Sequence, residues 1–269
     1  MEAILKYPGA KNRLADWIVS FIPEHKVYLE PYFGSGAVFF NKPKSKIETI
    51  NDLDGEIYNL FRIIREHSGE LAKLVEMTPY SREEYEKAYC KNADDTDIEK
   101  ARKFLVRCWM GMGSSNVYKN GFRSSQQGSS PKTTKHWGEV PERILISAER
   151  LKDAQIEKLE ALELLRRYDT KDVFTYLDPP YLPGTRKGYL YNHEMSEEGH
   201  IKLLETVITH PGRFLISGYD NDIYNTILNG WNKAQKQTQA EQGLKRVETI
   251  WFNYERDYQL NFSAGKAGF

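Results

Sequence analysis

The stretch VYLEPYFGSGAVFF (residues 27–40) decides the fold class. Its first residues read as a short strand that Pro31 ends, FGSG reads as a turn, and the apolar run from Ala37 begins a helix. A second strand is expected in KIETINDLD (46–54), followed by a helix in GEIYNLFRIIREH (55–67). This alternation of strand, helix and strand predicts an α/β fold built on parallel strands.

The rest of the chain has a helical middle and then returns to alternation. A first helix is expected in KNRLADWIVSFI (11–22), and LAKLVEM, SREEYEKAYC and DIEKARKFLVRCWMGM also have helical spacing. The polar stretch 113–138 has no period and is longer than an ordinary connection, which predicts a functional loop. Strands and helices then alternate again up to a last strand in VETIWFNY (247–254). We therefore expect an α/β domain formed by residues 1–59 and 141–269, with a mainly helical insert at 60–140.

The composition of the chain is that of a globular protein in a reducing compartment. Of its 269 residues, 40% are apolar and 13% aromatic, which is enough for a sizeable core. Its apolar runs fall short of the roughly 20 residues of a membrane span, and MEAILKYPGA does not resemble a signal peptide. Cys90 and Cys108 have neither disulfide nor metal-ligand spacing. We expect a cytoplasmic protein without a bound metal.

Charge is unevenly distributed, although 38 basic residues balance 38 acidic ones. From Glu48 to Glu99 there are 14 acids and 6 bases, a net charge of −8. From Lys100 to His136 there are 8 bases and no acid, a net charge of +8. The basic segment either faces a polyanion or pairs with the acidic segment before it, and composition alone does not choose between the two.

The glycine turn indicates a ligand site. In open α/β sheets, ligands bind beyond the carboxyl ends of the strands, where LEPYFGSG is expected to lie. A pyrophosphate cradle is poorly supported, because Phe39 stands where a third glycine would be needed. Asp52 follows Gly34 by 18 residues and can accept hydrogen bonds from a ribose, so with Glu30 it favours a nucleoside cofactor without phosphates over a plain turn.

YPGAK places Lys11 at the start of the first expected helix, where the macrodipole disfavours a cation. An anionic group nearby, such as a cofactor carboxylate, would offset this. A solvated lysine is the alternative.

The motif DPPY (178–181) directly follows the strand DVFTYL. Its prolines fix the backbone, so the motif is at least a rigid turn. In addition, the Asp178 carboxylate and a main-chain carbonyl at Pro179 can accept both hydrogens of an exocyclic amine, which directs the nitrogen lone pair towards an electrophile. Tyr181 offers a flat surface for stacking a base. The segment that follows, LPGTRKGYLYN (182–192), suits either a loop closing over a flipped base or an ordinary surface loop.

LDPPY after a strand, with LEPYFGSG and KYPGAKNRL before it, resembles the Dam-type DNA adenine-N6 methyltransferases (D12 class, alpha group), which use S-adenosylmethionine (SAM). The resemblance covers residues 1–60 and about 155–255, with the target-recognition insert between the glycine motif and DPPY. It implies a Rossmann-like, mostly parallel seven-stranded sheet with one antiparallel strand near the end. It also implies methyl transfer from SAM to N6 of a flipped adenine in double-stranded DNA, leaving S-adenosylhomocysteine.

The resemblance also implies roles for individual residues. Catalysis is assigned to the four residues of the DPPY motif, and a further pocket motif is expected at Ser217 to Asp220, which differs from the common Asn-His version. The implied cofactor-binding residues are Tyr7, Lys11, Glu30, Phe33, Gly34, Gly36, Asp52 and Asp178; the catalytic ones are Asp178, Pro179, Pro180 and Tyr181.

The insert is expected to hold the DNA, with phosphate contacts positioning the duplex and base contacts selecting the site. The candidate DNA-binding residues are Arg107, Asn116, Lys119, Arg123, Lys132 and Lys135. Cytosine-N4 methylation, adenine methylation in RNA and non-catalytic DNA binding are the alternatives, although cytosine-N4 enzymes more often have Ser in place of Asp178. A bacterial or phage-encoded monomer or weak dimer, with or without a cognate restriction endonuclease, fits this prediction.

Overall fold

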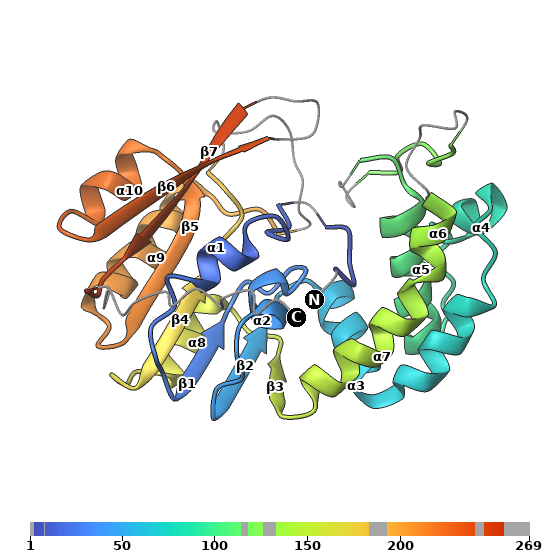
Figure 1. Cartoon of the computed structure of the whole chain (residues 1–269), viewed down its shortest axis with the longest axis horizontal. Helices are drawn as coiled ribbons and strands as arrows, with labels where there is room; N and C mark the ends of the chain where they lie inside the picture. Colours follow the sequence, from blue (N-terminus) through green and yellow to red (C-terminus); the bar gives the residue numbers. More distant parts are fainter. Residues whose placement is uncertain are drawn as a thin grey trace, which may run out of the picture.

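The computed structural model describes residues 3–7, 9–113, 118–125, 133–182, 193–239 and 245–255 (Figure 1). Within these ranges, seven strands form one sheet in the order β3-β2-β1-β4-β5-β7-β6. β7 is antiparallel to both of its neighbours, and the other pairings are parallel. The predicted fold class is therefore confirmed. The strands are β1 (Val27–Glu30), β2 (Ile47–Asn51), β3 (Ala154–Glu157), β4 (Val173–Leu177), β5 (Arg213–Tyr219), β6 (Asn232–Gln239) and β7 (Lys245–Phe252).

The strand order reverses between β1 and β4. The chain runs from β1 outwards to β2 and β3, and then returns to place β4 on the other side of β1. Leu29 of β1 pairs with Thr49 of β2 and with Thr175 of β4, so the three strands are in close register. Their carboxyl ends consequently open onto one crevice, the place where such sheets bind ligands.

Helices cover both faces of the sheet (Figure 1). One buried cluster joins α8, α9 and α10 to side chains such as Leu29 and Phe214, and a larger one joins α1, α2 and α3 to side chains such as Tyr28 and Phe174. Because successive strand residues face opposite sides and both sides are covered, every residue of β4 is buried. These helices are α1 (Ala15–Val19), α2 (Ala37–Asn41), α3 (Gly55–Glu76), α8 (Ala161–Arg167), α9 (Glu197–Thr209) and α10 (Asp222–Ile227). No helix in the described ranges is long and apolar enough to cross a membrane.

The insert is helical and continuous with the sheet domain. It contains α4 (Arg82–Lys87), α5 (Asp97–Met110), α6 (Thr133–Gly138) and α7 (Val140–Leu151), which form the lobe on the right of Figure 1 together with α3. The expected boundary at residue 60 falls inside α3, which packs on both α5 and α7 and has non-helical torsions only at His67. The division into two domains stays a proposal.

Three local expectations need correction. The first helix was expected over 11–22 but covers only Ala15–Val19; it is preceded by a turn in which the Leu14 N–H donates to the Lys11 carbonyl at 2.8 Å. The end of the polar stretch 113–138 forms α6. Polar β6 has no apolar alternation, and it is a strand because it pairs along its whole length with β7. Residues 114–117, 126–132 and 183–192 lie outside the described ranges, with Asn116, Lys132 and most of the LPGTRKGYLYN segment.

A buried charge cluster fastens the returning helix α7 to the sheet. The Glu48 carboxylate on β2, which is 2% exposed, accepts hydrogen bonds from Lys42, Arg150 of α7 and the Ser45 N–H. Burial alone would raise the pKa of Glu48, but these hydrogen bonds hold it at about 2. The guanidinium of Arg150 also lies 3.8 Å from the centre of the Phe39 ring. The carboxylate thus links α2, β2 and α7.

We predict that Arg150→Ala lowers the free energy of unfolding by about 2–3 kcal/mol, the value of hydrogen bonds to a charged group, because Lys42 still compensates the charge of Glu48. Because the folded pKa of Glu48 lies below its ordinary 4.5, this stabilisation is present above that pH and is lost as the pH falls towards 2. Urea unfolding at pH 7 and pH 4 measures both effects. Lys152→Ala, at an exposed position on the end of the same helix, should stay within about 0.5 kcal/mol of wild type. An equal loss of unfolding free energy in Arg150→Ala and Lys152→Ala would contradict the stabilising role of the Arg150–Glu48 pair.

Candidate active site

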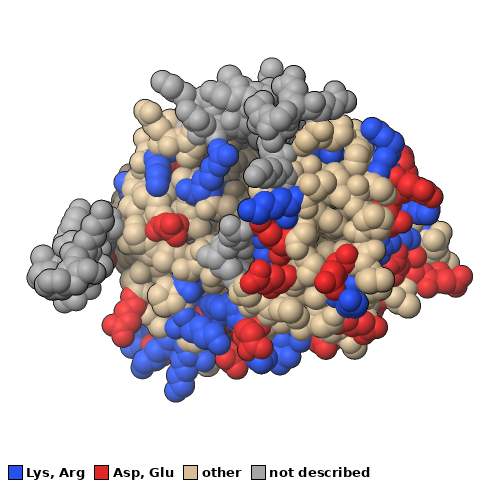
Figure 2. Space-filling view, turned by 45° about the vertical axis from the view of Figure 1, so that its right-hand side comes forward, with Lys and Arg blue, Asp and Glu red and all other residues tan. Residues whose placement is uncertain are grey.

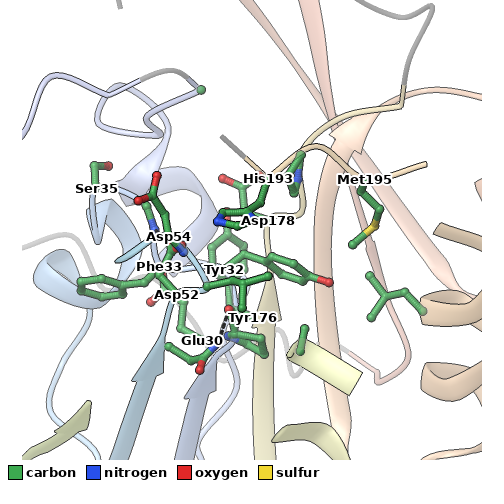
Figure 3. Close-up of a pocket in the computed structure, with 18 of the residues that line it drawn as sticks. Glu30, Tyr32, Phe33, Ser35, Asp52, Asp54, Tyr176, Asp178, His193 and Met195 are labelled. Carbon is green, nitrogen blue, oxygen red and sulfur yellow. Dashed lines mark hydrogen bonds between the residues drawn. The ribbon is translucent and has the colours of Figure 1, made fainter. Parts of the chain in front are cut away.

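A cavity of about 540 Å³ lies at the crevice formed by the ends of β1, β2 and β4. Figure 3 shows Asp52 and Asp54 on one side of it and Asp178 and His193 on the other. The predicted residues that line the cavity are Tyr7, Lys11, Glu30, Phe33, Gly34, Asp52, Asp178 and Pro180. Segments far apart in the sequence thus meet where the glycine motif and the DPPY motif were expected to lie.

The two predicted glycines, Gly34 and Gly36, are required for different structural reasons. Gly34 adopts a left-handed conformation (φ 50°), and its N–H donates to Oδ2 of Asp52 at 2.8 Å. Gly36 is also left-handed (φ 67°), and a Cβ there would lie 2.5 Å from Cζ of Phe33. Gly36 does not line the cavity. Gly36 instead allows the tight turn that follows Gly34, which does line the cavity.

Two acids at the strand ends hold their protons unusually firmly. Burial raises the pKa of Asp52 to about 7, although the Gly34 and Asp54 N–H groups lower it by donating to the carboxylate. Burial also raises the pKa of Glu30 to about 8, against a hydrogen bond from the Tyr28 hydroxyl that lowers it. Carboxylates with raised pKa values in a cavity are typical of functional sites.

Asp178 lies in a compact polar network at the end of β4. Lys11 Nζ donates to both of its carboxylate oxygens at 2.8 Å, and Ser217 Oγ of β5 donates to Oδ1 at 2.8 Å. Lys11 is only 5% exposed and also donates to the Gly9 carbonyl at 3.0 Å. The solvated-lysine alternative is therefore wrong. The expected anion near Lys11 is Asp178, and it is required by the burial of Lys11 rather than by a helix dipole, since α1 begins only at Ala15.

Tyr181 is held from two sides. Its hydroxyl donates to Oε1 of Glu248 on β7, and its ring meets Tyr219 of β5 edge-on with the ring centres 4.6 Å apart. Burial, with the nearby charges of Asp178 and Glu248, raises the pKa of Tyr181 well above its ordinary value, so the phenol keeps its proton as a donor. Tyr181 lies outside the large cavity, beside Asp178, and Lys11 Nζ is 4.7 Å from the centre of its ring.

The remaining residues of the two motifs have less direct roles. Pro180 lines the cavity, whereas Pro179 is buried behind it. Of the expected pocket motif at 217–220, Ser217 reaches Asp178, but Asp220 turns away and pairs with Lys233.

The basic segment of the insert is largely paired with the acidic segment before it. Five of its eight bases contact acids of residues 48–99, and on the right of Figure 2 basic and acidic side chains lie next to one another. These pairs are Lys100–Asp97, Arg102–Glu84, Lys103–Asp95, Arg107–Glu56 and Lys119–Glu86. Of the two alternatives left open by the sequence, internal pairing accounts for most of this charge.

The candidate DNA contacts are correspondingly fewer. Arg107 is 8% exposed and is bound to Glu56 and the Ala88 carbonyl, so its assignment as a DNA contact is wrong. Arg123 Nε donates to the Gly111 carbonyl at 3.0 Å and helps to hold a short antiparallel bridge between Gly111 and Phe122. Lys119 and Lys135 remain half or more exposed.

Several residues in or beside the cavity were not found from the sequence. Glu248 is a buried acid within an otherwise apolar strand segment, and this pattern could have marked it. Tyr32, Leu159, Leu162, His193 and Met195 line the cavity without any such signal. Among the residues that the structure describes, no group of three or more His, Cys, Asp or Glu could hold a metal ion.

Comparisons with known proteins agree with this geometry. The family model of D12 class N6 adenine-specific DNA methyltransferases matches residues 7–249. The chain is 25% identical to the type II methyltransferase M1.LlaDCHI of Lactococcus lactis subsp. cremoris over 76% of this chain and 75% of that protein. It is 20% identical to the type II methyltransferase M.MjaIII of Methanocaldococcus jannaschii over 86% and 89% of the two chains. It is 27% identical to the DNA N-6-adenine-methyltransferase of Escherichia phage P1, over 43% of this chain but only 16% of that protein.

The matched range contains the N-terminal lysine, the glycine turn, the insert and the DPPY motif. The fold brings the lysine, the glycine turn and the DPPY motif to one edge of the sheet. The chain therefore belongs to the D12 class of N6 adenine-specific DNA methyltransferases.

Proposed function

We propose that the protein moves a methyl group from SAM to N6 of an adenine flipped out of double-stranded DNA. The observation that carries this proposal is the position of Asp178, whose carboxylate is fixed by Lys11 and Ser217 at the rim of a cavity with nucleoside-type features. The alternative target, cytosine N4, has no observation in its favour.

The cavity residues fit SAM. Asp52 stands at the end of β2 with each of its oxygens accepting one backbone N–H, which leaves a further lone pair on each for ribose hydroxyls. Gly34 lacks a side chain beside the Tyr7 ring, so the backbone is open to a close ligand. Lys11 offers a cation at the methionyl end. SAM, when bound, supplies a methyl group on a positively charged sulfur, and the bonding pair stays with that sulfur as the methyl leaves.

The DPPY residues would prepare the acceptor nitrogen. Asp178 accepts one N–H of the adenine amine and the main-chain carbonyl at Pro179 accepts the other, which localises the nitrogen lone pair in the direction of the methyl group. As the N–C bond forms, the nitrogen becomes positive and releases one proton, for which Asp178 is the nearest base. Tyr181, held by Glu248 and Tyr219, offers its ring to the base plane.

A base in a duplex does not reach this crevice, so the adenine has to be extruded. We propose Lys119, Arg123 and Lys135 as phosphate or base contacts on the insert, with Asn116 and Lys132 in the parts of the chain outside the described ranges. The proposals that the chain is a monomer or weak dimer and acts with a restriction endonuclease stay predictions.

We predict that Asp178→Asn reduces methyl transfer to DNA by about a thousandfold or more, because an amide is a poorer acceptor for the amine hydrogens and a far weaker base. Asparagine preserves the shape of the side chain and an acceptor oxygen for Lys11 and Ser217, so the chain should remain folded. Transfer of a radiolabelled methyl group from SAM to genomic DNA measures the rate, and thermal unfolding checks the fold.

The matched control is Asp153→Asn, an identical change at a carboxylate whose side chain is 77% exposed. It should leave the rate unchanged. A folded Asp178→Asn variant with wild-type transfer would remove Asp178 from the mechanism.

We also predict that SAM binding weakens as the pH falls through about 7, because Asp52 then takes up a proton and loses acceptor strength for the ribose. Asp52→Asn should bind SAM on the order of tenfold more weakly at pH 8, the effect of losing hydrogen bonds to a charged group. The difference in SAM affinity between wild type and Asp52→Asn should become smaller at pH 6. Calorimetric titration from pH 6 to pH 8.5 measures this, and comparison with the variant removes the contribution of Glu30, which titrates in the same range. Parallel pH curves for the two proteins would show that Asp52 does not bind the cofactor.

A further inference from the structure

Glu248 is a buried carboxylate that no part of the mechanism above uses directly. It lies near the middle of β7, 5% exposed, and pairs in register with Tyr219 of β5. Its neighbours along the strand, Thr249, Ile250 and Trp251, are buried side chains without charge. A charged residue at such a position is costly unless it has specific partners.

The partners of Glu248 are residues of the catalytic network. The Tyr181 hydroxyl donates to its Oε1 oxygen, and Lys11 Nζ lies 3.7 Å from the same oxygen. The same Nζ is 2.8 Å from both oxygens of Asp178. Lys11 therefore stands between two carboxylates, in direct contact with one and just beyond hydrogen-bond distance of the other.

The position of Lys11 conflicts with the role of Asp178. Lys11 and Ser217 already occupy much of the acceptor capacity of the Asp178 carboxylate, which has to receive an amine hydrogen. A lysine cation on that carboxylate also opposes the positive charge that develops on the amine nitrogen. The flexible lysine stem allows Nζ to shift the short distance to Oε1 of Glu248. Burial and the nearby Asp178 charge raise the pKa of Glu248 above its ordinary value, while the Lys11 charge and the hydrogen bond from Tyr181 oppose this shift.

We propose that Glu248 is a positioning residue of the methyl-transfer site, which receives the Lys11 ammonium when the target amine engages Asp178 and anchors Tyr181 through its hydroxyl. This inference rests on the proposed function and adds a residue to it. The Lys11 ammonium then moves from the Asp178 carboxylate to the Glu248 carboxylate. Asp178 becomes free to accept the amine hydrogen, and the buried lysine cation keeps a negative partner.

The test compares Glu248→Gln and Glu248→Asp with wild type. Glutamine keeps the length and an acceptor for Tyr181 but loses the charge that holds Lys11, so kcat should fall on the order of tenfold. The KM for SAM should change less than about twofold, because Glu248 does not line the large cavity. Aspartate keeps the charge with a shorter reach, so it should retain more activity than glutamine. Higher activity in Glu248→Gln than in Glu248→Asp would overturn the proposal.

A double-mutant cycle with Lys11→Gln separates this role from a structural one. If Glu248 acts through Lys11, the kcat loss of the double variant should be clearly smaller than the product of the two single losses. Independent, multiplicative losses would overturn the proposal, as would a kcat loss matched by a fall in melting temperature. Glu163→Gln, the same change at a half-exposed position on α8, should match wild type in all readouts.

Failure of the proposed function gives a different result from failure of this inference. If wild-type protein does not methylate DNA while it binds SAM, the proposed function fails. If wild type methylates adenine and Glu248→Gln does so at the same rate, only the role of Glu248 fails.

Discussion

The contact on which the site depends is the ion pair between Lys11 and Asp178, which joins residues 167 positions apart in the chain. It ties the N-terminal segment to the end of β4, and through Ser217 and Glu248 the same network reaches β5 and β7. Because Lys11 is almost fully buried, it requires a negative partner. The N-terminal segment therefore lies against the switch point of the sheet, and α1 begins only at Ala15. The pairing of β1 with β2 and β4 brings the glycine turn and the DPPY motif to one edge of the sheet, and this ion pair holds the N-terminal segment against them.

Much of this arrangement could be predicted from local patterns. Acids that directly follow apolar strands lie at the carboxyl edge of a parallel sheet, which is why Asp52 and Asp178 were found from the sequence. The glycine turn was predicted because FGSG follows a strand that proline ends, and the structure shows positive φ angles there at Gly34 and Gly36. In each case the signal and the structural cause lie within a few residues of each other in the chain.

Features decided by distant partners could not be predicted in this way. β6 is polar and becomes a strand through its pairing with β7, and Glu248 contacts Lys11 and Tyr181, which are distant from it in the sequence. In the insert, the assignment of Arg107 to DNA was wrong, because Arg107 is buried against Glu56. Composition revealed a basic segment next to an acidic one, but only the packing of α3, α4 and α5 shows that most of these charges neutralise each other. The uncompensated positive charge of the described part of the insert is therefore smaller than its composition suggests.

The most direct test of the account is to identify the methylated nucleoside. Plasmid DNA would be incubated with the protein and SAM carrying a deuterated methyl group, digested to nucleosides, and analysed by mass spectrometry against synthetic standards. The account predicts deuterium-labelled N6-methyladenine as the product, formed from double-stranded DNA and absent without the protein. Labelled N4-methylcytosine, or no labelled nucleoside from a protein that binds SAM, would contradict it.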